Sequence, residues 1–115
     1  MSTPAIDLAT FDALKETTGA DFARELVDTF LEEAPAMLGD LREAMASNDA
    51  DKFRRAAHSL KSNSLTFGAL ALGAMARELE LTNVAKVRAS GAQPLAALTD
   101  EYLRVAAALT ELRHA

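Results

Sequence analysis

The chain has 115 residues, of which half are hydrophobic and none is cysteine, and its formal net charge is −5. That length supports one domain with a modest core and excludes a two-lobed enzyme that carries its own nucleotide-binding domain. Without cysteine there is no disulfide framework, thiol nucleophile or cysteine metal site. The two histidines, His58 and His114, are too far apart for a zinc motif of the HxxxH or HExxH type. We therefore expect neither a metal site nor a bound cofactor.

The distribution of apolar and charged residues limits the partners of the chain. No apolar run approaches the ~20 residues that a membrane-spanning helix needs. The N-terminus also lacks the basic region and apolar stretch of a signal peptide. An acidic chain is poorly suited to nucleic acid, because phosphate contacts need a basic surface. We expect a cytoplasmic monomer with no membrane or nucleic-acid partner.

Two helices are predicted in the N-terminal part of the chain. The first spans about 8–17, with Asp7 as a candidate N-cap and Gly19 as its stop. The second begins near Asp21, and its apolar residues follow helical spacing: Phe22, Leu26, Phe30, Leu38, Leu41 and Met45. Pro35 either kinks this helix or begins a new one. Because the apolar stripe continues past Pro35, we favour one kinked helix.

Three further helices are predicted at about 50–66, at about 70–87 and from near Pro94 onward. Gly68 ends the first of them, and a loop at 90–94 precedes the last. The last helix has its own apolar stripe: Leu95, Leu98, Tyr102, Val105, Leu109 and Leu112. Short connections between long amphipathic helices imply antiparallel neighbours. The predicted fold is all-α, an antiparallel up-down four-helix bundle with a short extra N-terminal helix, in a single domain over residues 1–115.

One side of the third predicted helix carries a candidate site. At about 100° per residue, the apolar residues gather opposite His58: Phe53, Ala56, Leu60 and Phe67. The side shared with His58 carries the following residues: Arg54, Arg55, Lys61, Ser62 and Leu65. An exposed histidine among basic residues is usually an ordinary solvated helix face. The alternative is a nucleophile, because neighbouring cations disfavour protonation of the imidazole and would stabilise a phosphoryl group bound to it.

The third and fourth predicted helices form a hairpin that places a carboxylate near His58. Residues equally far from a turn at Gly68 lie side by side, which brings Glu80 and Arg77 within about one turn of the level of His58. Small residues on this stripe would let the helices approach closely: Ala69, Gly73 and Ala76. Glu80 is then either an ordinary surface carboxylate or the acceptor of a hydrogen bond from one nitrogen of His58, which leaves the other nitrogen free to react.

The segment A-H-S-L-K-S-N-S-L-T-F-G-A at residues 57–69 resembles the signature of histidine-containing phosphotransfer (HPt) domains of two-component phosphorelays. The resemblance extends over nearly the whole chain, including the stretches 30–35, 48–50 and 77–80. It implies that His58 carries a phosphoryl group on Nε2 and that Lys61 contacts the phosphoryl oxygens. It also implies that Glu80 bonds the imidazole Nδ1. In one departure, Ser62 stands where the family usually has glycine, a position that gives the partner close access.

The resemblance implies partners rather than a complete enzyme. Receiver domains of response regulators would exchange the phosphoryl group and supply Mg²⁺, and a histidine kinase or hybrid kinase would act in trans. Arg54 and Arg55 would steer an acidic receiver, and Ser62, Leu65 and Arg77 would belong to the contact surface. Three alternatives are a non-transferring binding module of the same fold (an adaptor or kinase inhibitor), a phosphoacceptor domain of the chemotaxis-kinase type, and a helical structural protein with an incidental histidine.

Overall fold

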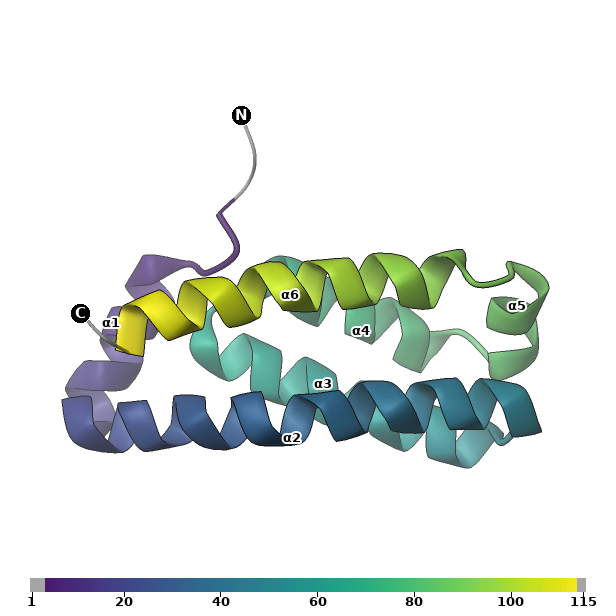
Figure 1. Cartoon of the computed structure of the whole chain (residues 1–115), viewed down its shortest axis with the longest axis horizontal. Helices are drawn as coiled ribbons and strands as arrows, with labels where there is room; N and C mark the ends of the chain where they lie inside the picture. Colours follow the sequence, from purple (N-terminus) through teal and green to yellow (C-terminus); the bar gives the residue numbers. More distant parts are fainter. Residues whose placement is uncertain (1–3, 114–115) are drawn as a thin grey trace.

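The computed structural model describes residues 4–113, and within this range the chain forms six helices and no strand (Figure 1). In chain order they are α1 (Leu8–Thr18), α2 (Ala20–Ser47), α3 (Ala50–Phe67), α4 (Leu70–Leu81), α5 (Val84–Ala89) and α6 (Gln93–Arg113). The all-α prediction is thus confirmed. No helix in the described range is long and apolar enough to cross a membrane. The second histidine, His114, lies outside the described residues.

Helix α1 begins and ends where the sequence predicts. The Asp7 carboxylate accepts a hydrogen bond from the backbone N–H of Thr10 at 3.2 Å, which satisfies one of the free donors of the first turn. At the other end, Gly19 adopts a φ of +90°, a conformation that residues with a Cβ rarely adopt. The backbone N–H of Asp7 also donates to the carbonyl oxygen of Gly68 at 2.7 Å. This bond fastens the start of α1 to the end of α3.

Helix α2 is one continuous helix across Pro35, so the interpretation as one helix is confirmed over that of two. Its buried side chains follow helical spacing on one face: Ala23, Val27, Phe30, Ala34, Leu38, Leu41 and Ala44. The prediction that Phe22 belongs to this face is wrong, because its side chain is half exposed. The neighbouring Ala23 takes the inward position, and a residue one place earlier points about 100° away from it.

The prediction of one helix over 70–87 is wrong, because α4 ends at Leu81 and α5 begins at Val84. Thr82 is extended, and the side chain of Asn83 accepts the backbone N–H of Lys86 at 2.8 Å. A short polar side chain that bonds the backbone in this way favours a cap over a helix interior. The break turns the chain so that Val84 and Val87 are both buried.

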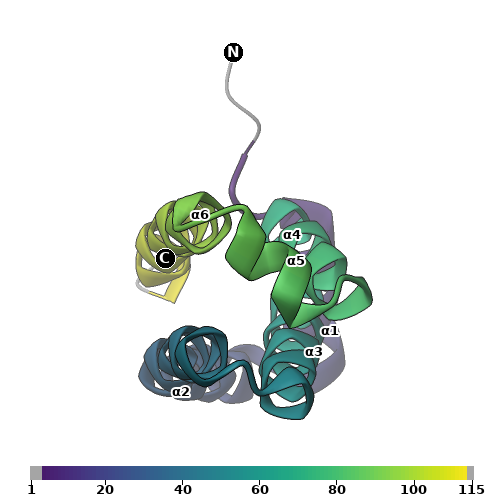
Figure 2. The same ribbon diagram turned by 90° about the vertical axis from the view of Figure 1, so that its right-hand side faces the viewer.

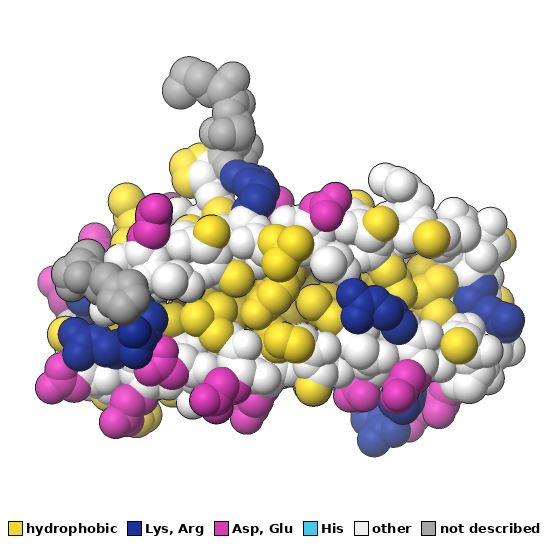
Figure 3. All heavy atoms as spheres, in the orientation of Figure 1, with side chains coloured by type: hydrophobic (Ala, Val, Ile, Leu, Met, Phe, Trp, Pro, Cys, Tyr) yellow, Lys and Arg dark blue, Asp and Glu magenta, His cyan; other side chains and the backbone are white. Residues whose placement is uncertain are grey.

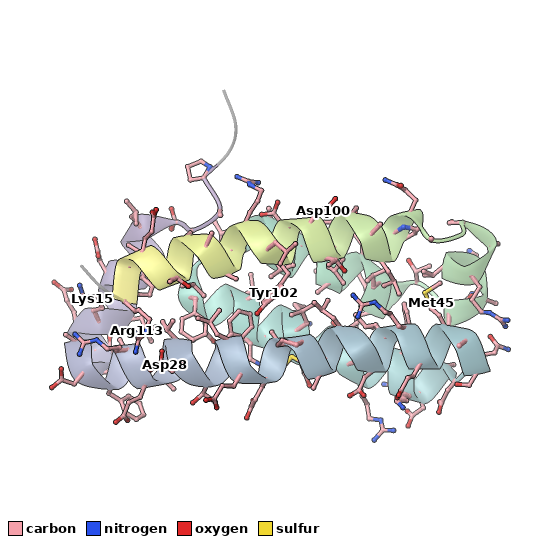
Figure 4. All side chains as sticks on the ribbon, viewed as in Figure 1. Lys15, Asp28, Met45, Asp100, Tyr102 and Arg113 are labelled. Atoms are coloured by element: carbon pink, nitrogen blue, oxygen red, sulfur yellow. The ribbon has the colours of Figure 1, made fainter. Side chains whose placement is uncertain are left out.

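The long helices run side by side in alternating directions (Figure 1), and the end view places α2, α3, α4 and α6 at four corners (Figure 2). Helices α2 and α4 each pack against both α3 and α6. Between α2 and α6, Tyr102 packs edge-on against Phe30 with ring centroids 6.1 Å apart (Figure 4). Near the end of α6, Arg113 forms an ion pair with Asp28 of α2 at 2.6 Å (Figure 4). The small helices α1 and α5 lie at opposite ends.

The face formed by α2 and α6 carries much of the acidic charge of the molecule. Figure 3 shows acidic side chains along the α2 edge, a band of apolar side chains between the two helices, and no described histidine. The exposed carboxylates of α2 include Glu25, Glu32, Glu33, Asp40 and Glu43. The candidate site around His58 belongs to α3 and α4, on a different side of the molecule.

Candidate functional site

Helix α3 presents His58 to solvent because its opposite side is buried. The helix starts at a cap in which Asp49 accepts the backbone N–H of Lys52 at 3.0 Å. Phe53 and Leu60 are almost fully buried, and they fix the rotation of the helix about its axis. The side chain of His58 is 59% exposed. The predicted orientation of this helix, with His58 opposite the buried side, is confirmed.

Glu80 reaches from α4 to the imidazole and to a second cation. Its Oε1 lies 2.7 Å from Nδ1 of His58, and its Oε2 lies 2.7 Å from Nζ of Lys61. The Glu80 side chain is only 17% exposed, so it is held between the two helices. The predicted contact between Glu80 and His58 is therefore present. Lys61, which the resemblance assigns to phosphoryl oxygens, lies on this carboxylate in the unphosphorylated chain.

The charge of Glu80 determines which nitrogen of His58 is free. Lys61 first, and His58 second, hold the pKa of the Glu80 carboxyl below its usual range, so the group is ionised at neutral pH. An ionised carboxylate can only accept hydrogen bonds. In the neutral imidazole, Nδ1 of His58 then carries the hydrogen and donates it to Glu80, which leaves Nε2 with a lone pair. The exposed ring presents this lone pair as a nucleophile.

The three cations expected around His58 are all engaged with carboxylates of the same chain. Nη2 of Arg54 lies 2.8 Å from Oδ1 of Asp51, and Nε of Arg55 lies 3.2 Å from Oδ2 of the same residue. With Lys61 on Glu80, each of the three cations has an acidic partner from its own chain. Asp51 is a site residue that the sequence predictions do not include, although its i, i+3 and i, i+4 spacing to the two arginines is the usual signal for ion pairs along a helix.

A shallow hollow of about 430 Å³ adjoins the imidazole, lined by Arg54, Arg55, His58, Ser59 and Glu80. The hollow is open to solvent on the side of α3 that carries the arginines. Its rim therefore combines a nucleophilic nitrogen with two guanidinium groups. Such a surface can take an anionic group brought by another molecule, because guanidinium N–H groups donate well to phosphate and carboxylate oxygens.

Three further residues that were predicted to contact a partner lie outside the contact between His58 and Glu80. Ser62 is exposed one turn beyond His58, and its hydroxyl makes no hydrogen bond within the described residues. Leu65 is 45% exposed and lies over Gly73, where an added Cβ would come within 2.7 Å of its Cδ2. Arg77 is exposed on α4, with no ion pair to any residue of the described range, and it does not line the hollow. The close helix approach expected at Gly73 is thus present.

Comparisons with known proteins agree with this arrangement. The family model described as "Hpt domain" matches residues 25–115. The crystal structure of histidine-containing phosphotransfer protein B (HptB) from Pseudomonas aeruginosa PAO1 is similar, with a TM-score of 0.79 and 29% sequence identity. The similarity covers 98% of this chain and 97% of that one. A comparison with curated proteins finds no significant match. The chain belongs to the Hpt domain family.

Proposed function

We propose that this chain relays a phosphoryl group between Nε2 of His58 and the aspartate of a receiver domain in a two-component phosphorelay. The observation that carries the proposal is the 2.7 Å contact between Nδ1 of His58 and an ionised Glu80, with the rest of the ring in solvent. This contact holds the imidazole in the tautomer that can attack phosphorus. The scaffold is an antiparallel four-helix bundle in which α2, α3, α4 and α6 supply the long helices.

The transfer step balances without a cofactor from this chain. The Nε2 lone pair attacks the phosphorus of the aspartyl phosphate, and the bond between phosphorus and the aspartate oxygen breaks. The electron pair of that bond stays on the aspartate as a carboxylate. The phosphorylated imidazole keeps its hydrogen on Nδ1 and gains a positive charge, which the Glu80 carboxylate stabilises at 2.7 Å. Mg²⁺ held by the receiver would neutralise charge on the phosphoryl oxygens.

Lys61 and Ser62 would act once the phosphoryl group has arrived. Lys61 lies one turn from His58, and its long stem lets Nζ leave Oε2 of Glu80 for a phosphoryl oxygen. Ser62, which lacks a partner for its hydroxyl in the described range, can donate to the same group. Arg54, Arg55 and Arg77 would steer the acidic partner, and Leu65 would supply apolar contact area. The contact would be small and transient, between a cytoplasmic monomer and a receiver or kinase.

The test is phosphorylation by receiver domains from the same source. The purified chain is incubated with each phosphorylated receiver, and acid-labile, alkali-stable phosphate on the chain is measured. Wild type and the His114→Gln variant should be labelled, whereas His58→Gln should not be labelled. Because the chain has only two histidines, this pair assigns the label to one of them. Labelling of His58→Gln equal to that of wild type would contradict the proposal. Binding to a receiver or kinase without any labelling would favour the non-transferring module.

A further inference from the structure

The cations next to His58 are already engaged in the free chain. Arg54 and Arg55 share the two oxygens of Asp51, and Lys61 lies on Glu80. Counting these five groups, three positive and two negative charges leave a net charge of +1. An acidic partner that approaches the hollow beside His58 therefore meets a surface whose positive charge is largely compensated. The N–H groups on Nη2 of Arg54 and on Nε of Arg55 can bond a partner only after the ion pairs with Asp51 open, whereas each guanidinium keeps its other N–H donors.

The two groups of ion pairs differ in how easily they open. Asp51 is 62% exposed, and both of its arginines are more than 60% exposed, so water can replace either pair at little cost. Glu80 is only 17% exposed and is also bonded to His58. If the ion pair between Lys61 and Glu80 opened, the poorly solvated Glu80 carboxylate would lose one of its two hydrogen-bond partners. The pairs with Asp51 should therefore open first when a partner arrives.

From this difference we infer that Asp51 is a positioning residue that holds Arg54 and Arg55 in ion pairs, in competition with an acidic partner, and so lowers the rate of productive docking. The inference rests on the proposed function and concerns how docking at the same site is regulated. In the free chain, the Asp51 carboxylate compensates the guanidinium groups. On docking, the acidic surface of a phosphorylated receiver competes with Asp51 for the same N–H donors. Asp51 thereby sets how strongly negative a partner must be in order to engage the site.

The inference predicts a faster reaction when the competitor is removed. Asp51→Asn should raise the second-order rate constant of phosphoryl transfer from a phosphorylated receiver by about twofold to fivefold at low ionic strength. The maximal rate at saturating receiver should not change, because Asp51 does not touch the reacting atoms. The gain should fade between about 10 mM and about 300 mM salt, as the screening length shrinks from roughly 30 Å to below 10 Å. Asp51→Glu keeps the charge and should react like wild type.

A matched control distinguishes the local effect of Asp51 on the arginines from an effect of net charge. Asp100→Asn changes the net charge by the same amount, but Asp100 lies on the outer edge of α6 (Figure 4), and α6 packs on α2 and α4. We expect no change in its rate constant. Asp51→Asn is also made in an Arg54→Gln, Arg55→Gln background. If Asp51 acts through the arginines, its removal should accelerate transfer much less there than in the wild-type background.

The outcomes distinguish the inference from the proposed function on which it rests. If wild type accepts no phosphoryl group from any receiver, both are overturned. If wild type transfers and Asp51→Asn has the same second-order rate constant at low salt, the inference alone is overturned. An equal acceleration with and without the two arginines would show that Asp51 acts only as a negative charge, which also overturns the inference. Thermal unfolding of each variant verifies that it is folded under the assay conditions.

Discussion

Replacing Gly73 with alanine tests whether the close contact between α3 and α4 positions Leu65. An added Cβ at residue 73 would lie 2.7 Å from Cδ2 and 3.0 Å from Cγ of Leu65, closer than nonbonded carbon atoms approach. Gly39, in the interior of α2, is a matched control, because an added Cβ there meets nothing within 4 Å. Both substitutions give the same increase in helix propensity, about 1 kcal/mol in favour of folding.

The difference in the free energy of unfolding between Gly39→Ala and Gly73→Ala gives the free-energy cost of moving Leu65. Because Leu65 is 45% exposed, its side chain can rotate outward and need not push the helices apart. The rotation forfeits most of its packing on α4, about 1 kcal/mol, because a half-buried leucine has only about half of the burial energy of a fully buried one. Gly39→Ala should therefore stabilise the chain by about 1 kcal/mol, or roughly 4 °C in melting temperature. Gly73→Ala should leave the stability almost unchanged.

Urea unfolding of the two variants measures these free energies, and phosphoryl-transfer kinetics measure the effect on docking. With Leu65 displaced, Gly73→Ala should raise the receiver concentration needed for half-maximal rate, and Gly39→Ala should not. If Gly73→Ala stabilises the chain as much as Gly39→Ala does, Leu65 does not rest on Gly73. If Gly73→Ala costs more than about 3 kcal/mol, Leu65 cannot move and the contact between the helices must itself open. Either result would refute the reasoning.

Three further predictions concern the site and the helix that carries it. The folded-state pKa of Glu80 lies below its ordinary value of 4.5, so its carboxylate contributes to stability above that pH and the contribution is lost as the pH falls through the folded pKa. The difference in unfolding free energy between wild type and Glu80→Gln should thus narrow as the pH falls below 4.5 and through the folded pKa, and a constant difference would contradict the lowered pKa. Phe53→Ala should cost about 3–5 kcal/mol in urea unfolding, because Phe53 is 1% exposed. A cost near zero would show that α3 does not depend on this anchor. Asp49→Ala should cost about 1 kcal/mol through loss of the α3 cap, measured in the same way, and no loss would mean that the cap is dispensable.

Much of the site could be predicted because it depends on short-range periodicity. The capping residues Asp7 and Asp49, and the glycines that end α1 and α3, act on backbone groups within a few residues. The exposure of His58 follows from the burial of the opposite side of α3. The contact between His58 and Glu80 follows from the register of a hairpin that turns at Gly68, because both helices rise by the same distance per residue.

Other predictions were wrong or missing because the features concerned depend on competition between local and distant contacts. The break at 82–83 depends on Asn83, whose cap competes with continuation of the helix and succeeds because Val84 and Val87 then reach the core. Phe22 is apolar and helically spaced, but Ala23 is the residue that faces the other helices. The pairs of Arg54 and Arg55 with Asp51, by contrast, follow the i, i+3 and i, i+4 spacing of ion pairs within one helix, so local sequence alone carries the signal for them.

The amino-acid sequence by itself determined the helices other than the division between α4 and α5, the side of α3 that bears His58, and the candidate carboxylate for its Nδ1. Those features depend on hydrophobic periodicity and on hydrogen bonds between near neighbours. Only the tertiary structure decided the partner of Lys61. Lys61 lies on Glu80 because the packing of α3 against α4 brings that carboxylate within reach, whereas the arginines pair with Asp51 inside α3. A charge count cannot distinguish an engaged cation from a free one, since that difference depends on distances of a few ångströms across and along the helices.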